Sequence, residues 1–160
     1  MAEKNNKCSI VVMSGDMDRV MGAFIIATGA AASGMETSMF FTFWGLNAVR
    51  KENARSGEGL LGKAMGLLNK GGIENLNPSK FSFGGLGRRM FKRMMKQKNV
   101  ASLSQLLEMA VDLDVKLIAC KMSMDVMEIT EDVLIDEVSE IAGVATFVQS
   151  AANSEINLFI

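Results

Sequence analysis

The segment LIACKMSMD (Leu117–Asp125) contains the strand-to-helix junction from which the fold is predicted. An apolar run that ends in a thiol is typical of the end of a buried strand, and the residues after it are typical of the first turn of a helix. The N-terminus of a helix lowers the pKa of a neighbouring thiol. Because the chain has no histidine, Cys120 is its best candidate for chemistry. An inert core thiol is the alternative, since free cysteine is often buried.

Outward from this junction, apolar β-branched runs alternate with helical patterns. Strands are predicted at residues 8–14, 36–42, 115–120, 138–141 and 156–160, and helices at 18–33, 103–110 and 143–153. Asp18, Ser102 and Thr130 are expected to cap helices, with Gln105 at the capping-box position after Ser102. Such alternation predicts an α/β fold, a three-layer sandwich with a mostly parallel sheet of about five strands flanked by helices.

Residues 54–99 break this alternation. The segment is dense in glycine and holds the only proline, Pro78. A long segment without clear periodicity is typical of a lid, an oligomer arm or an insertion. We therefore expect a Gly/Met-rich basic insertion or flap at about 54–99 in a single domain that spans residues 1–160. A short helix is also expected at residues 46–53, before it.

Within the insertion, Arg88–Lys98 has helical spacing with one apolar face and basic residues around the rest. The apolar face consists of Met90, Phe91, Met94 and Met95. Such a helix either packs against its own protein or contacts a membrane surface or an acidic partner.

Charge is balanced in total but segregated along the chain. The 17 basic and 18 acidic residues give a net charge of −1, which argues against general nucleic-acid binding. Between residues 60 and 100, Glu74 is the only acidic residue. From Glu108 onward there are eleven acidic residues and only two basic ones, Lys116 and Lys121. The segregated charges could attract each other within the chain, attract each other between subunits, or bind an acidic partner through the basic segment.

Several classes of protein are disfavoured. Two cysteines make no disulfide framework, and the polar start of the chain is unlike a signal peptide, so a cytoplasmic protein is predicted. Residues 20–46 hold one charge and are long enough to span a bilayer. However, Ser33-Gly34 indicates that a helix ends in the middle of this stretch. A buried helix followed by a buried strand is therefore favoured over a membrane span. The lack of histidine predicts no zinc or iron–sulfur site, and no cofactor is expected.

The loops after the first three predicted strands meet at one rim if those strands are parallel. Cys120 is the predicted catalytic residue there. The predicted substrate pocket comprises Ser14, Gly15, Asp16, Trp44, Gly45, Lys121, Met122 and Ser123. Simpler structural roles stay open: Gly15-Asp16 as a turn, Trp44 as a packing residue and Met122 as a core or subunit contact.

Cys8 is expected at the opposite, amino end of its strand. A strand of that length spans about 20 Å at roughly 3.3 Å per residue. A disulfide needs Cα atoms closer than about 7 Å, so pairing of Cys8 with Cys120 within one subunit is disfavoured.

Three motifs carry a family resemblance: SGDMDRV (Ser14–Val20), MFFTFWGL (Met39–Leu46) and ACKMSMDVM (Ala119–Met127). Together they resemble the DsrE/DsrF-like sulfur-transfer superfamily, in its longer subgroup often labelled peroxiredoxin-like. The resemblance covers nearly the whole chain. It implies homo-oligomers, commonly trimers or hexamers, and a cysteine that carries sulfane sulfur as a persulfide or thiosulfonate, which on this match is Cys120. No Thr-x-x-Cys peroxidatic motif is present, and Cys8 matches no family motif.

Two functions from different classes follow. The first is a sulfurtransferase or sulfur carrier whose Cys120 thiolate takes sulfane sulfur from a donor and passes it to a partner thiol. Rhodanese-like or small sulfur-carrier proteins are the implied partners. The alternative is a non-catalytic oligomeric adaptor whose basic flap, through residues 88–98, binds a membrane surface or an acidic protein. A nucleotide-binding module is disfavoured because GGLGRR (Gly84–Arg89) lacks the phosphate-loop pattern.

Overall fold

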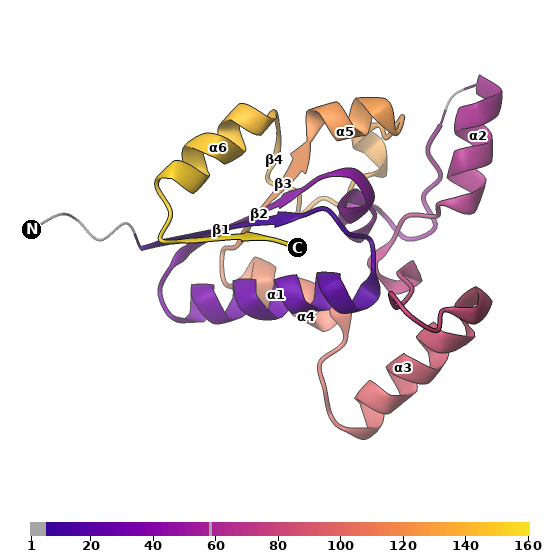
Figure 1. Cartoon of the computed structure of the whole chain (residues 1–160), viewed down its shortest axis with the longest axis horizontal. Helices are drawn as coiled ribbons and strands as arrows, with labels where there is room; N and C mark the ends of the chain where they lie inside the picture. The colour runs from indigo at the N-terminus through magenta and orange to yellow at the C-terminus, as the bar shows by residue number, and fades with distance from the viewer. Residues whose placement is uncertain (1–5, 58) are drawn as a thin grey trace, which may run out of the picture.

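The computed structural model describes residues 6–57 and 59–160, and within them one parallel sheet forms the centre of the molecule (Figure 1). Its strands lie in the order β4-β3-β2-β1-β5. They are β1 (Lys7–Val12), β2 (Glu36–Phe41), β3 (Lys116–Cys120), β4 (Glu140–Ala142) and β5 (Ile156–Phe159). Every neighbouring pair is parallel, which confirms the predicted sheet. Parallel strands are covered on both faces, and this explains why β1 is an almost continuous apolar run.

Two helical layers cover the sheet (Figure 1). One layer contains α1 (Met17–Ala32) and α4 (Leu103–Asp112), and the other contains α5 (Lys121–Val126) and α6 (Val144–Ala152). The predicted capping box of α4 is confirmed: Ser102 accepts a hydrogen bond from the N–H of Gln105, whose side chain accepts one from the N–H of Ser102. The three-layer α/β fold predicted from the sequence is therefore correct.

The apolar stretch 20–46 forms α1 and β2 and not a membrane span. Val20, Phe24 and Ala27 of α1 are fully buried and belong to the main core of the protein. Among the described residues, no helix is long and apolar enough to cross a membrane. The predicted sequence of a buried helix followed by a buried strand is confirmed.

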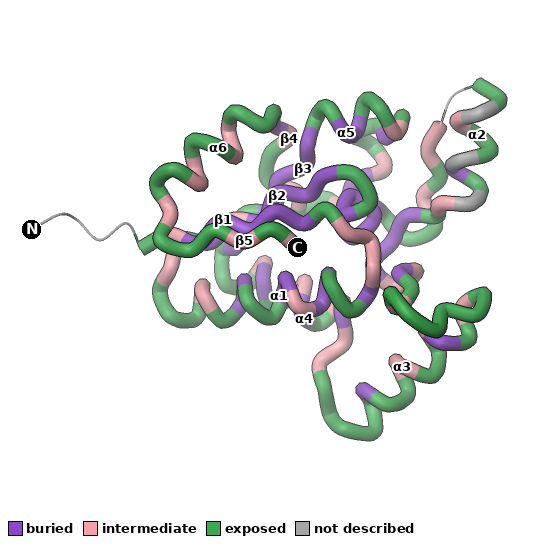
Figure 2. Tube along the Cα trace, in the orientation of Figure 1, coloured by how far each residue is buried: buried purple, intermediate pink, exposed green. Residues whose placement is uncertain are grey.

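α6 packs loosely on the sheet, and Figure 2 shows no buried position along this helix. A small cluster lies beneath it: Phe40, Ile118, Cys120 and Ala142. The half-buried Phe147 of α6 packs against this cluster, with its ring centroid 5.5 Å from that of Phe40. At the other end of α6, the Ser9 hydroxyl lies 2.9 Å from those of Ser150 and Ser154. One ring contact and a hydroxyl network therefore hold α6 on the sheet.

The insertion lies between β2 and α4 and extends beyond the sheet (Figure 1). It contains α2 (Gly59–Leu68), α3 (Leu86–Gln97) and two short 3₁₀ turns, Ile73–Asn75 and Phe83–Gly85. The helix predicted at 46–53 is a 3₁₀-helix, Phe43–Val49, which ends earlier because Arg50 takes an extended conformation.

Two predicted caps were wrong. Asp16 occupies the N-cap of α1, while Asp18 accepts hydrogen bonds from the backbone N–H and hydroxyl of Ser79, at 2.7 and 2.6 Å. Asp18 therefore fastens the insertion to α1. Thr130 precedes only a 3₁₀ turn, Glu131–Val133, and its side chain makes no cap hydrogen bond.

Arg50 fixes the base of the insertion. Its side chain is 1% exposed, and its guanidinium donates to the Asn47 side chain at 2.9 Å and to the carbonyl oxygens of Ala54 and Asn69 at 2.8 and 3.3 Å. Gly71 packs directly against it, since a Cβ there would lie 2.8 Å from Arg50 Nε. One buried cation thus joins the two ends of the segment that contains α2.

Candidate functional site

Cys120 is the last residue of β3 and the N-cap residue of α5. β3 lies between β2 and β4, so this junction is inside the sheet at its carboxyl edge, where α/β proteins place their ligands. The junction predicted from LIACKMSMD (Leu117–Asp125) is confirmed. The thiol itself is buried, with 2% of the residue exposed.

Burial and hydrogen bonding act in opposite directions on the pKa of the Cys120 thiol. Burial raises the pKa of this thiol, but hydrogen bonds from the hydroxyl and N–H of Ser123, the hydroxyl of Thr42 and the N–H of Met122 outweigh it, so the pKa lies below its ordinary value. These donors stabilise the negatively charged sulfur specifically. The thiolate is the nucleophilic form of cysteine, and the site therefore favours the reactive state.

The two hydroxyls at the site also contact each other. Thr42 Oγ1 lies 2.6 Å from Ser123 Oγ, and both side chains are buried. Each hydroxyl has one hydrogen, so when one of the two donates to the other, the second remains free to donate to the sulfur. Polarisation along these two hydrogen bonds strengthens the one that reaches the sulfur.

Thr42 was not among the predicted site residues. It follows β2 directly, and parallel pairing of β2 with β3 brings it beside the start of α5. Its position in the motif MFFTFWGL (Met39–Leu46), at the carboxyl end of a buried strand, was the signal that could have identified it.

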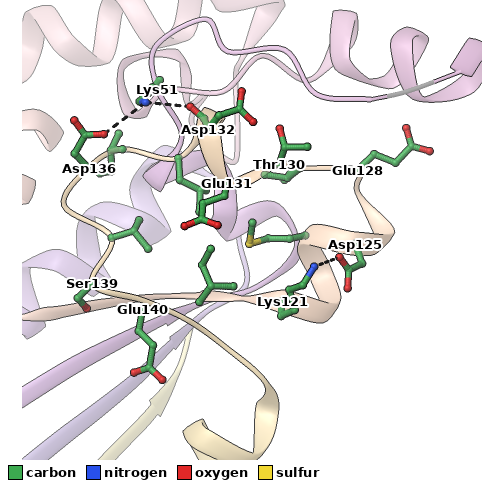
Figure 3. Close-up of a pocket in the computed structure, with 16 residues that line it drawn as sticks. Lys51, Lys121, Asp125, Glu128, Thr130, Glu131, Asp132, Asp136, Ser139 and Glu140 are labelled. Atoms are coloured by element: carbon green, nitrogen blue, oxygen red, sulfur yellow. Dashed lines mark hydrogen bonds and ion pairs between the residues drawn. The ribbon is translucent and has the colours of Figure 1, made fainter.

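The side chains of Lys121 and Met122 lie in solvent and not in the buried surroundings of the Cys120 sulfur. Both side chains are exposed, and the ammonium of Lys121 forms an ion pair with Asp125 one turn later in α5 (Figure 3). Met122 reaches the sulfur through its backbone N–H only. The positive charge of Lys121 is therefore paired with the carboxylate of Asp125.

Four other predicted pocket residues share a separate polar cavity. Ser14, Gly15, Asp16 and Trp44 line this cavity, whose volume is about 490 Å³. Amide side chains and Arg88 of the insertion form its other walls. Cys120 does not line this cavity. The structure thus divides the predicted pocket into two groups of residues at the same edge of the sheet.

Gly15 and Gly45 allow the first two loops to cross. A Cβ on Gly45 would lie 2.0 Å from the carbonyl oxygen of Val12, and one on Gly15 would lie 2.8 Å from that of Trp44. Gly45 also donates its N–H to the carbonyl oxygen of Met13 at 2.9 Å. These two glycines are therefore required for packing at the edge of the sheet.

An acidic groove of about 1090 Å³ lies beside α5 (Figure 3). Its charged lining residues are Lys51, Lys121, Asp125, Glu128, Glu131, Asp132, Asp136 and Glu140. Both lysines are engaged: Lys51 Nζ lies 3.5 Å from the Asp136 carboxylate, and Lys121 pairs with Asp125. No cluster of three or more carboxylate, cysteine or histidine groups within 6–57 and 59–160 has a metal-binding arrangement.

Cys8 differs from Cys120 in its surroundings. It is buried in β1, opposite Thr37 of β2 and Ile156 of β5, and burial raises the pKa of its thiol. Both cysteines are free, and β2 lies between their strands. The site is therefore built around a single sulfur.

Fold and site together define an α/β protein with one thiol of lowered pKa at the carboxyl edge of a parallel sheet. The chain belongs to the DsrE/DsrF/DrsH-like family, whose model matches residues 4–159. This confirms the resemblance seen in the three sequence motifs.

The relatives match along their whole length. The chain is 44% identical over 161 residues to the uncharacterized protein YrkE of Bacillus subtilis (strain 168), with complete coverage of both chains. It is 34% identical to the sulfur carrier protein DsrE2 of Allochromatium vinosum, covering 98% of this chain and 99% of that one. The crystal structure of the ychN protein from E. coli shares the fold, with a TM-score of 0.55, 16% identity and coverage of 96% and 98%.

Proposed function

We propose that this protein carries sulfane sulfur covalently on Cys120 and passes it to the thiol of a partner. The observation that carries the proposal is the set of groups from Thr42, Met122 and Ser123, which lowers the pKa of the Cys120 thiol despite its burial. A sulfur-transfer role in general is supported by family membership and by the relative named as a sulfur carrier.

Loading is a displacement at sulfur. The Cys120 thiolate attacks the outer sulfur of a donor persulfide, R–S–SH, and forms a new S–S bond as the donor S–S bond breaks. The donor leaves as the thiolate RS⁻ with the bonding electron pair, and Cys120 becomes a persulfide. Unloading is the same step in reverse, with an acceptor thiolate attacking the outer sulfur. No external oxidant or reductant enters either step.

The same thiolate can carry a thiosulfonate. Attack on a central sulfur of tetrathionate breaks the central S–S bond, leaves an –S–SO₃⁻ group on Cys120 and releases thiosulfate. Whether the protein turns over as a sulfurtransferase or acts only as a carrier depends on the acceptor. Rhodanese-like or small sulfur-carrier proteins are the proposed partners, and a trimer or hexamer in the cytoplasm is the proposed assembly.

Reaction also requires access to a buried sulfur. Cys120 lies under the α6 layer with Phe40, Ile118 and Ala142, and Phe147 of α6 closes this cluster. Because no residue of α6 is fully buried, displacement of this helix is the opening that costs the least packing. We propose that a donor reaches the sulfur by this route.

Intact-mass analysis after incubation with polysulfide, and separately with tetrathionate, tests the proposal. We expect the wild type to gain one sulfur with polysulfide and an –S–SO₃⁻ group with tetrathionate, and Cys120→Ser to gain neither. Cys8→Ser is the matched control, since Cys8 is buried as well but lacks the donors, and it should load like the wild type. Equal loading of the Cys120→Ser variant would overturn the proposal.

A further inference from the structure

The outer side of the insertion exposes a group of large apolar side chains. Phe81 and Phe83 are 75% and 72% exposed, and three residues of α3 are more than half exposed. We call the five the docking face: Phe81, Phe83, Leu86, Met90 and Met94. Four of these five, all but Leu86, line one apolar groove of about 420 Å³. Clustered exposure of this kind marks an interaction surface, because soluble proteins rarely expose large contiguous apolar patches.

The local backbone holds the two phenylalanines outward. Phe81 and Phe83 both have left-handed conformations, with φ of 59° and 40°, and their rings stack with centroids 6.0 Å apart. Gly87 packs beneath them, where a Cβ would lie 1.7 Å from the carbonyl oxygen of Phe81. Such conformations are costly for bulky residues and persist where the surroundings fix them. The outward aromatic pair is therefore a built feature of the turn.

α3 separates its inner and outer sides. On the inner side Met95 is buried, Arg88 donates to the carbonyl oxygen of Asn75 and Lys92 pairs with Glu74. On the outer side Leu86, Met90 and Met94 form a stripe with a spacing of four residues. The predicted apolar face of Met90, Phe91, Met94 and Met95 is thus divided: only Met95 is buried, and Phe91 is half-buried.

Basic residues border the docking face. Between Glu74 and Glu108 the chain contains no acidic residue. Arg89 and Arg93 form a stripe of their own next to the apolar stripe of α3. Five basic residues form no ion pair within the described ranges: Lys80, Arg89, Arg93, Lys96 and Lys98. Asp18 is the one acid at the groove, and Ser79 already engages its carboxylate.

We propose that this face docks the protein on an anionic lipid membrane. The apolar side chains enter the interface between headgroups and acyl chains, and the arginines and lysines contact the anionic headgroups. The contact is peripheral, since no helix within the described ranges can cross a membrane. This inference goes beyond sulfur transfer and is independent of it, because Cys120 lies in the sheet and the docking face lies on the insertion.

The acidic groove of a second copy of the chain is a less suitable partner for the docking face than an anionic membrane. Its carboxylates match the charge, but the apolar residues that line it are all buried or half-buried. Two of its charged positions are occupied by ion pairs with Lys51 and Lys121. A partner for the docking face has to supply an apolar medium beneath a negative surface. An anionic bilayer has both properties.

Co-sedimentation of the full-length protein with lipid vesicles tests the proposal. We expect binding to vesicles that contain phosphatidylglycerol, little binding to pure phosphatidylcholine, and weakening as chloride rises. Inorganic phosphate at matched ionic strength should compete no better than chloride. Equal binding to the two kinds of vesicle, or binding to neither, would overturn it.

Variants locate the contact. Phe81→Asn with Phe83→Asn suits the left-handed backbone and should lower the vesicle partition coefficient about ten-fold or more. Arg89→Gln with Arg93→Gln should lower it about thirty-fold. The matched control is Val144→Ser with Val148→Ser, which removes exposed apolar side chains from α6 and should bind like the wild type. Thermal unfolding of each variant verifies its fold.

Two further results separate this proposal from its rivals and from sulfur transfer. Cys120→Ser should bind vesicles normally, and the double asparagine variant should load sulfur normally. Size-exclusion chromatography tests a second copy as the occupant: if the asparagine variant dissociates an oligomer that the wild type forms, another subunit covers the docking face and the lipid proposal is wrong.

Discussion

Cys120 and Cys8 show how two buried thiols in one sheet acquire opposite properties. Burial by itself would raise the pKa of either thiol. Only Cys120 has compensating donors, because it is at the carboxyl end of its strand, where the turn into α5 exposes backbone N–H groups. Cys8 is at the amino end of β1, with its neighbours paired in the sheet. Position along the strand therefore decides which thiol has the lowered pKa.

Removal of the Ser123 hydroxyl should raise the pKa of Cys120. The folded-state pKa lies below the unfolded value, so the thiolate contributes stability above the unfolded pKa and loses it as pH falls through the folded pKa. We expect Ser123→Ala to be alkylated by iodoacetamide more slowly at neutral pH, with the midpoint of the pH–rate profile moved upward. The stability gap between the two proteins should shrink as pH falls.

The control for this experiment is Ser150→Ala, which removes a hydroxyl that bonds Ser9 on the same face of the sheet. Its profile should coincide with that of the wild type. An unchanged midpoint in Ser123→Ala would show that the hydroxyl does not stabilise the thiolate.

At the scale of the elements, the two faces of the sheet have different packing. α1 buries a row of side chains in the main core, whereas α6 buries none completely. The larger core makes one face rigid. The other face, with Cys120 beneath it, is covered by a helix whose local opening requires little loss of packing.

Truncation of Phe147 should make Cys120 more accessible. Its ring contact with Phe40 is worth about 0.5–1.5 kcal/mol, so Phe147→Ala should populate the open form about two- to ten-fold more. We expect alkylation of Cys120 to accelerate by a similar factor at a pH where the thiol is fully ionised. Val148→Ala, which truncates the exposed neighbouring residue, should react at the wild-type rate. Equal rates in the two variants would exclude α6 as the route.

The whole molecule consists of a sheet that carries the sulfur site and an insertion that carries the docking face. The polar contacts that join them include the Arg50 guanidinium, the hydrogen bonds of Asp18 to Ser79, and Glu74. Glu74 pairs with Lys92 of α3 and accepts a hydrogen bond from Ser104 of α4. None of the described ion pairs joins α3 to the acidic residues around α5.

Loss of Arg50 should loosen the insertion from the sheet. Arg50→Met keeps the apolar stem but removes one hydrogen bond each from the oxygens of Asn47, Ala54 and Asn69. We expect the free energy of unfolding to fall by about 2–4 kcal/mol and proteolysis near residues 54–71 to accelerate. The exposed Arg55 provides the control, and Arg55→Met should unfold like the wild type. Urea unfolding measures the difference, and equal stability of the two variants would contradict the role of Arg50.

The sequence by itself determined the strands, the α4 cap and the strand-to-helix junction at Cys120. These features depend on local signals: apolar runs of strand length, the spacing of Ser102 and Gln105, and the change of pattern at a thiol. A parallel sheet followed from the alternation of elements, since parallel strands need crossover helices.

The tertiary structure decided which side chains meet. Thr42 reaches Ser123 only because β2 pairs with β3, and Arg50 reaches Asn69 only because the insertion folds back on itself. The exposure of Phe81 and Phe83 depends on a left-handed turn that no hydrophobic pattern encodes. Local sequence sets the conformation of a segment and places Met122 and Ser123 beside the Cys120 sulfur, whereas contacts between distant segments depend on how the elements pack, and the contribution of Thr42 to the site is a contact of that second kind.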